Sequence, residues 1–259
     1  MDLFDTHCHI DVEEFAADRA EVLAAARRAG VAEMLVPAVE RGTWQALLDL
    51  CGDDPGLYPA LGLHPVYLER HRVEDAGALA DAVESARPVA VGEIGLDWFV
   101  KGLDRERQQR LLEAQLEVAE AFSLPVVLHV RKAHDAMLAT LRRYRLQGGT
   151  CHAFNGSIDQ AQRYIDMGFR LGFGGMLTFE RSSRLRRLAS ELPLEAIVLE
   201  TDAPDMTVAS HRFERNSPEY LPEVLATLAE LRDMPEDEVA RITTETARAV
   251  FRPAQAEPA

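Results

Sequence analysis

Pro125-Val126-Val127-Leu128-His129-Val130-Arg131 places four apolar residues directly before a histidine. A run this short and this uniformly apolar is typical of a strand that is buried on both faces, as in a parallel sheet covered by helices. Ala196-Ile197-Val198-Leu199 is a second run of the same kind. Both runs predict strands of a parallel sheet.

Strand-like and helix-like segments alternate along the whole chain. The predicted strands cover residues 3–7, 33–38, 57–62, 89–92, 126–130, 150–153, 170–173 and 196–200. Amphipathic segments predict helices over 18–29, 104–122, 135–144, 157–167, 181–192, 222–231 and 236–251. This order favours an α/β fold, a single (β/α)8 TIM barrel over residues 1–252, with a disordered tail over 253–259. A doubly wound open sheet is the alternative, although its glycine-rich nucleotide turn is missing from the sequence.

The charge of the chain argues against a broad nucleic-acid-binding surface. The 259 residues carry 28 basic and 43 acidic side chains, a net charge of −15, which repels polyanions. No basic stretch interleaved with aromatic residues is present for tracking single strands. A nucleic-acid end could still enter a metal-filled cleft, because bound divalent cations reverse the local sign of the charge.

The chain has three cysteines, Cys8, Cys51 and Cys151. Their small and odd number argues against a disulfide framework. Cys8 and Cys151 each flank a candidate histidine ligand, so on a strand they would point away from it into the core. The chain shows neither a signal-peptide pattern nor an apolar run of membrane-spanning length. We therefore expect a cytoplasmic protein without membrane contact, and the oligomeric state stays open, a monomer included.

Asp5-Thr6-His7-Cys8-His9 lies at the end of the first predicted strand. The period of two residues along a strand would place Asp5, His7 and His9 on one face. Two imidazoles directed at one point, with a carboxylate behind them, suit a divalent metal ion. The stretch predicts two metal ligands.

Further polar residues stand at the ends of other predicted strands. Glu93 and Asp202 follow the fourth and eighth strands, and His129 and His152 close the fifth and sixth. In a closed parallel barrel these strand ends converge on one mouth, where barrel enzymes have their active sites. Burying several imidazoles and carboxylates there without a counter-charge is costly, so a metal is the simplest compensation.

Four histidines and two carboxylates exceed the needs of one tetrahedral ion with an open position. We therefore predict a binuclear centre with two divalent ions per chain, bridged by Glu93. One ion is assigned to His7, His9, Glu93 and Asp202, and the other to Glu93, His129 and His152. The ligand types do not distinguish Zn, Mn, Mg and Co.

Three more residues frame this predicted centre. His64 ends the third strand and faces the same mouth, and Arg131 is in reach of an anionic substrate oxygen with its planar guanidinium. Asp97 is placed to orient a metal ligand. We predict His64 and Arg131, together with Asp202, as catalytic residues.

These motifs together resemble the TatD family of metal-dependent hydrolases, within the amidohydrolase-like barrels. The matching pieces are Asp5-Thr-His-Cys-His9, Gly62-Leu-His-Pro65, Gly92-Glu-Ile-Gly-Leu-Asp97, His129-Val-Arg131, His152-Ala-Phe-Asn-Gly156 and Glu200-Thr-Asp-Ala-Pro204. The sequence over 199–206 is similar to the YjjV-like branch. The resemblance implies a TIM barrel, the same six metal ligands, and hydrolysis of ester bonds, with DNA phosphodiesters as a substrate of several relatives. It also implies that His64 lies near the substrate phosphate.

The expected mechanism is metal-assisted hydrolysis. A water between the two ions is acidified and supplies hydroxide, and Asp202 accepts its proton. The second ion and Arg131 hold the non-bridging oxygens, while His64 protonates or hydrogen-bonds the leaving oxygen.

Three functional hypotheses follow from these residues. The first is a deoxyribonuclease or phosphodiesterase that acts on DNA ends. The second is a small-molecule hydrolase acting on a phosphoester, lactone or amide in the same metal site. The third, a non-enzymatic metal-binding protein on a retained barrel, is disfavoured by the complete ligand set. A steep loss of activity with salt would indicate a nucleic-acid substrate.

Overall fold

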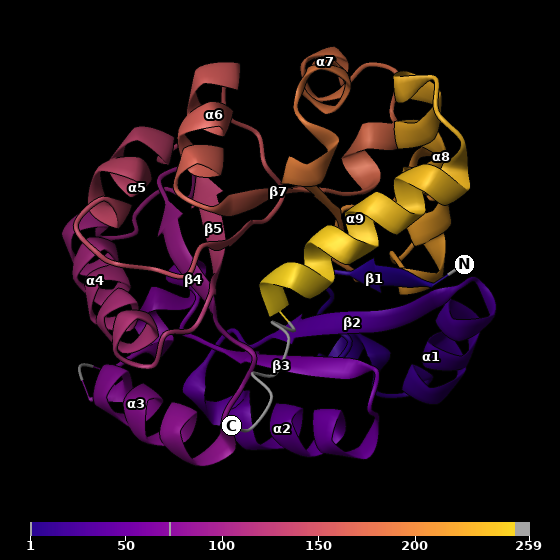
Figure 1. Ribbon diagram of the computed structural model, residues 1–259. Coiled ribbons are helices and arrows are strands. Elements are labelled where there is room, and N and C mark those ends of the chain that lie inside the picture. The colour runs from indigo at the N-terminus through magenta and orange to yellow at the C-terminus, as the bar shows by residue number, and fades with distance from the viewer. Residues whose placement is uncertain (1, 73, 252–259) are drawn as a thin grey trace, which may run out of the picture.

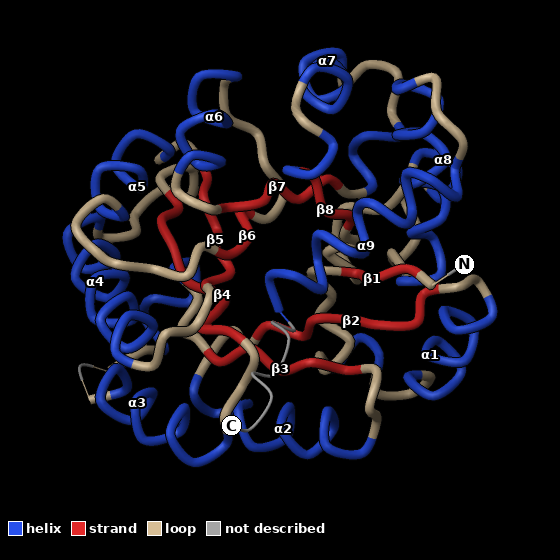
Figure 2. The backbone as a smooth tube through the Cα atoms, viewed as in Figure 1, coloured by secondary structure: helices blue, strands red, loops and turns tan. Residues whose placement is uncertain are grey.

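Eight parallel strands form the centre of the computed structural model, which describes residues 2–72 and 74–251. The strands are β1 (Leu3–Asp5), β2 (Val31–Pro37), β3 (Leu57–Leu61), β4 (Ala90–Asp97), β5 (Val126–Arg131), β6 (Gly149–Cys151), β7 (Phe169–Phe173) and β8 (Ile197–Leu199). Each strand pairs in parallel with the next one in sequence. Figure 2 shows them as a ring surrounded by helices. The predicted barrel is confirmed, and the sequential strand order rules out the doubly wound sheet.

Hydrogen bonds beyond the ends of β1 and β8 close the ring. The N–H of Thr6 donates to the Leu199 carbonyl at 3.0 Å, and the N–H of Asp202 donates to the His7 carbonyl at 2.8 Å. The seam of the barrel therefore runs through two of the predicted metal ligands.

Helices cover the outside of the barrel (Figure 1). They are α1 (Arg19–Arg28), α2 (Trp44–Asp53), α3 (Asp75–Ala86), α4 (Arg105–Ala121), α5 (His134–Leu141), α6 (Ile158–Asp166), α7 (Ser183–Glu191), α8 (Leu221–Arg232) and α9 (Glu236–Phe251). The sequence did not predict α2 and α3. Neither begins with a side-chain cap, and in α3 only Leu79 and Val83 supply large buried apolar side chains. Packing on the barrel stabilises them more than local signals do.

The last helix fills the amino-terminal end of the barrel. Ala247 and Phe251 of α9 pack in one cluster with Phe4 of β1, Leu35 of β2 and Val127 of β5. In Figure 1 the yellow α9 lies across the ring of strands. This end is sealed by apolar side chains, so the opposite end is left for chemistry.

Two strand boundaries differ from the expectation and matter for the site. β1 ends at Asp5, so His7 and His9 follow the strand, and the expected shared strand face of Asp5 and the histidines was wrong. β4 continues to Asp97, which places Glu93 inside the strand. Gly95 permits this pairing, because a Cβ there would lie 1.9 Å from the His129 carbonyl oxygen of β5.

All three cysteines are buried and free, which agrees with core thiols. Among the helices that the structure describes, none has the length and apolar character needed to cross a membrane. The predicted tail 253–259 lies outside the described residues.

Candidate metal centre

The six predicted ligands lie together at the carboxyl ends of the strands. They come from the segment after β1 (His7, His9), from β4 (Glu93) and β5 (His129), and from the segments after β6 (His152) and β8 (Asp202). Three overlapping groups of their donor atoms, one of which includes His64, are close enough to hold a metal ion.

The four ligands assigned to the first ion, called the first donor group below, have donor atoms close to one another. His7 Nε2 lies 3.1 Å from Glu93 Oε2 and 3.2 Å from His9 Nε2. Asp202 Oδ1 lies 3.6 Å from His7 Nε2 and 3.7 Å from His9 Nε2. Metal bonds of about 2.0–2.2 Å in a tetrahedron separate neighbouring ligands by roughly 3.3–3.6 Å. This donor set therefore fits a divalent ion.

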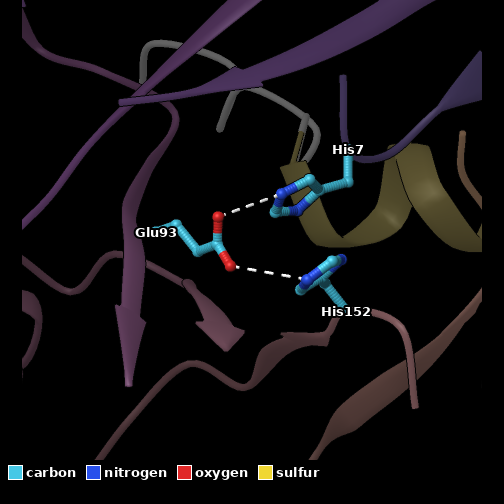
Figure 3. A group of neighbouring side chains, drawn as sticks. All are labelled: His7, Glu93 and His152. Carbon is cyan, nitrogen blue, oxygen red and sulfur yellow. Dashed lines mark hydrogen bonds and ion pairs between the residues drawn. The ribbon is translucent and has the colours of Figure 1, made fainter. Parts of the chain in front are cut away.

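The second group surrounds the other oxygen of Glu93. Its Oε1 lies 2.9 Å from His129 Nδ1, 3.2 Å from His64 Nε2 and 3.5 Å from His152 Nε2. Figure 3 shows Glu93 between His7 and His152, with one carboxylate oxygen directed at each. One carboxylate thus faces both groups, an arrangement that suits a bridging ligand.

Hydrogen bonds on the far side orient two of the imidazoles. His9 Nδ1 lies 3.1 Å from the Pro37 carbonyl, and His129 Nε2 lies 3.0 Å from Asp97 Oδ2. The other oxygen of Asp97 accepts the N–H groups of Phe99 and Val100 at 2.8 and 2.9 Å. In a neutral ring, such partners leave a lone pair on the nitrogen that faces the centre, as expected for metal ligands. Asp97 occupies the orienting position predicted for it.

Proton affinities in the cluster are shifted by burial and by neighbouring charges. Burial lowers the pKa of His9 and His152, but Glu93 and Asp202 outweigh it and raise these pKa values to about 9 and about 10. Burial raises the pKa of Asp202 to about 6. Burial, with the charge of His152, keeps the pKa of His7 well below its ordinary value. The buried carboxylates thus favour positive charge at these positions, which suits a site for divalent cations.

His64 is a hydrogen-bond donor on the floor of the site. Its Nδ1 accepts the N–H of Val66 at 3.1 Å, so in the neutral ring the proton is on Nε2, the atom that faces Glu93. Burial lowers the pKa of His64 to about 4, which keeps the ring neutral near pH 7. In this tautomer His64 offers an N–H to the site and no lone pair to a metal.

A cavity of about 930 Å³ opens above the cluster. Arg131 lines it, with its guanidinium carbon 3.8 Å from the ring centre of the exposed Phe99. Tyr67, Arg181 and Arg184 line the same cavity. The structure therefore places the predicted Arg131 at the rim, above the donor groups.

Two acidic residues have surroundings that the sequence did not reveal. Asp5 is buried, and its carboxylate accepts the Thr201 hydroxyl at 2.5 Å and the N–H groups of Thr201 and His7, so it fixes backbone and not an imidazole. Glu200 is buried beside His152, with its Oε1 3.4 Å from His152 Nδ1. In the sequence, the stretch Glu200-Thr201-Asp202 indicated only that acidic residues follow the eighth strand. The structure is needed to show that Glu200 faces His152 whereas Asp202 faces His7.

Known proteins share this architecture over nearly the whole chain. A model of the TatD related DNase family matches residues 4–252. The metal-dependent hydrolase YjjV of Escherichia coli K12 is 43% identical over 240 residues, covering 92% of this chain and 93% of that protein. The crystal structure of the E. coli K12 TatD homolog YjjV superposes with a TM-score of 0.92 at 41% identity, covering 96% and 97% of the two chains.

A relative that is named as an exonuclease also matches over nearly its full length. The 3'-5' ssDNA/RNA exonuclease TatD of Pantoea vagans is 32% identical over 258 residues, covering 96% of this chain and 99% of that protein. The extent of these matches, together with the clustered histidines and carboxylates, identifies the chain as a member of the TatD family of metal-dependent hydrolases.

Proposed function

We propose that the protein is a metal-dependent phosphodiesterase that hydrolyses the ends of DNA strands in a binuclear site. The observation that carries the proposal is Glu93, whose two oxygens face different sets of donor atoms in one cavity. The exonuclease activity of the Pantoea relative supports a nucleic-acid substrate.

Divalent ions held by the two groups would acidify a water and withdraw charge from the scissile phosphate. Asp202, with its carboxylate at the first group, accepts the proton of the attacking water. Arg131 binds a non-bridging oxygen as negative charge develops. His64 donates its Nε2–H as a hydrogen bond to the leaving oxygen.

The cavity rim favours a nucleic acid over a compact substrate. Tyr67 is 36% exposed and lines the cavity. Arg131 stacks on Phe99, and Arg181 lies with its guanidinium carbon 5.3 Å from the ring centre of Phe179. Bases stack on aromatic rings and on guanidinium planes. These groups lie at or after the ends of different strands, so they can form a stacking surface without the contiguous basic and aromatic stretch that the sequence lacks.

The test uses metal-reconstituted protein on single-stranded DNA, RNA and a small phosphodiester. We expect Asp202→Asn to lower turnover on every cleaved substrate by about 10²–10⁴-fold, because the proton acceptor is lost. Glu93→Ala should abolish turnover. The urea midpoint of Asp202→Asn checks that the fold is intact. Near-normal turnover in a folded Asp202→Asn would remove the assigned role, and activity that survives in Glu93→Ala would indicate a contaminant.

A small-molecule hydrolase remains the second candidate, favoured by the net charge of −15. The dependence of turnover on salt concentration distinguishes the two candidate functions. Turnover of a polyanion that contacts several arginines should fall steeply with ionic strength, whereas a small neutral ester should respond weakly.

A further inference from the structure

Glu200 is a buried carboxylate that the proposed chemistry does not use. It follows β8, its side chain is 1% exposed, and its Oε1 accepts the N–H of Ala153 at 2.6 Å. The same oxygen lies 3.4 Å from Nδ1 of His152, the ring nitrogen opposite the one that faces Glu93. Burying a carboxylate is costly, so its place beside a candidate ligand calls for an explanation.

The contact between Glu200 and His152 leaves two polar atoms unsatisfied. Within residues 2–72 and 74–251, His152 Nδ1 and Glu200 Oε2 are both buried without a hydrogen-bond partner. Among the described residues, the carboxylate oxygen within ion-pair distance of His152 Nδ1 is Oε1 of Glu200. A proton on Nδ1, directed at Glu200, would satisfy that nitrogen and would leave the lone pair of Nε2 directed at Glu93 and the second donor group.

The neighbouring strand leaves room for this carboxylate. Gly172 of β7 lies against Glu200, and a Cβ at that position would be 2.1 Å from Glu200 Oε2. Any other residue there would displace the carboxylate. Gly172 on one side and the N–H of Ala153 on the other therefore fix Glu200 in its place.

We propose that Glu200 is a positioning residue of the metal centre: its carboxylate accepts the Nδ1 proton of His152 and holds Nε2 of that ring as a metal donor. The inference rests on the metal-dependent function proposed above. Carboxylates in this relation to a metal-bound histidine typically change metal affinity by about 10–100-fold.

The experiment measures the zinc affinity of the full chain by competition with a chromogenic chelator. Glu200→Gln should bind zinc about 10–100-fold more weakly. The urea midpoint of its metal-free form should stay unchanged or rise, because the substitution removes a buried negative charge near Asp202 and Glu93. A residue with a merely structural role would move the midpoint down and leave the affinity alone.

Glu33→Gln is the matched control. Glu33 is a buried carboxylate of β2 that pairs with Arg248 of α9 at 2.6 Å, close to the sealed end of the barrel. The same chemical change there should lower the urea midpoint and leave the zinc affinity at its wild-type value.

Wild-type zinc affinity in Glu200→Gln overturns the inference and leaves the proposed function standing. If Glu200→Gln does not fold, Gly172→Ala decides, because it keeps the carboxylate but pushes it away. A loss of about tenfold or more in Gly172→Ala supports the inference, and wild-type affinity overturns it. A wild-type chain that binds no divalent metal overturns both this inference and the proposed function.

Discussion

At the scale of single residues, backbone conformation decides what the polar side chains do. Asp202 has a φ of +59°, in the left-handed region that Asp tolerates better than most residues. Its N–H closes the barrel on the His7 carbonyl, while its carboxylate lies near both His7 and His9. One residue thus takes part in the fold and in the candidate site.

The sequence predicted the six candidate ligands because each stands close behind an apolar run, and strand ends of a barrel meet at one mouth. The partners of those ligands were harder to predict. Asp97 was named as an orienting residue, and its contact with His129 has that geometry. Asp5 was expected behind the imidazoles but binds Thr201, because β1 ends earlier than the alternation suggested.

His64 is predicted to matter most when the leaving group is a poor one. We expect His64→Ala to lower turnover of a DNA phosphodiester by about 10²–10³-fold, because one hydrogen bond to the developing alkoxide is lost. A nitrophenyl diester, whose leaving anion is already stable, should lose less than about tenfold. Since the pKa of His64 is lowered to about 4, the wild-type rate should show no titration of this ring between pH 6 and 8. Equal losses on both substrates would contradict this role.

At the scale of elements, strands were predicted better than helices. Short apolar runs identify buried strands, and all eight predicted strand segments overlap observed strands. The aromatic residues of the cavity rim were not predictable in the same way, because Tyr67 follows β3, whereas Phe99, which Arg131 of β5 contacts, follows β4. Which loop residues meet above the mouth depends on the closed barrel, and no local pattern records it.

Two glycine substitutions should have opposite effects on stability, one at the close contact of β4 with β5 and one on the exposed face of α3. Gly95→Ala should destabilise the protein by about 2–3 kcal/mol, because its Cβ would meet the His129 carbonyl. Gly77→Ala, in the exposed part of α3 with nothing within 4 Å of the new Cβ, should stabilise by about 0.5–1 kcal/mol. Urea unfolding of both variants checks this. A Gly95→Ala protein as stable as the wild type would mean that the strand pair can spread.

At the scale of the whole molecule, charge is distributed unevenly. The chain has a net charge of −15, yet Arg131, Arg181 and Arg184 line the cavity. Asp5, Glu93 and Glu200 lie buried around the mouth, and Asp202 lies beside them. Without cations, buried acids repel one another and keep protons on neighbouring imidazoles.

Metal binding should therefore release protons and stabilise the fold. In the metal-free protein, His9 and His152 have pKa values raised to about 9 and about 10, so both are protonated at pH 7 and must lose a proton to bind a metal. We expect at least two protons released per zinc-loaded chain at pH 7, because the pKa of His129 is raised as well, and fewer above pH 9. Zinc titration in buffers of different ionisation enthalpy counts them.

The raised pKa values of His9 and His152 also determine how the stability of the metal-free fold changes with pH. A raised histidine pKa stabilises the metal-free fold below pH 6.5, the ordinary histidine value, and this contribution is lost as the pH rises through about 9 to 10. Chelation should thus lower the melting temperature more at pH 9 than at pH 6.5, as scanning calorimetry with and without a chelator would measure. A larger effect of chelation at pH 6.5 would contradict the assigned shifts.

The seam between β1 and β8 also has a consequence for biosynthesis. Asp5 and Thr201, which hydrogen-bond across it, are 196 positions apart, and the candidate ligands lie on both sides. A chain still emerging from the ribosome holds His7 and His9 long before Asp202 exists. The candidate metal centre is therefore incomplete during most of synthesis, and it is assembled only when the last strand has been made and has docked against β1.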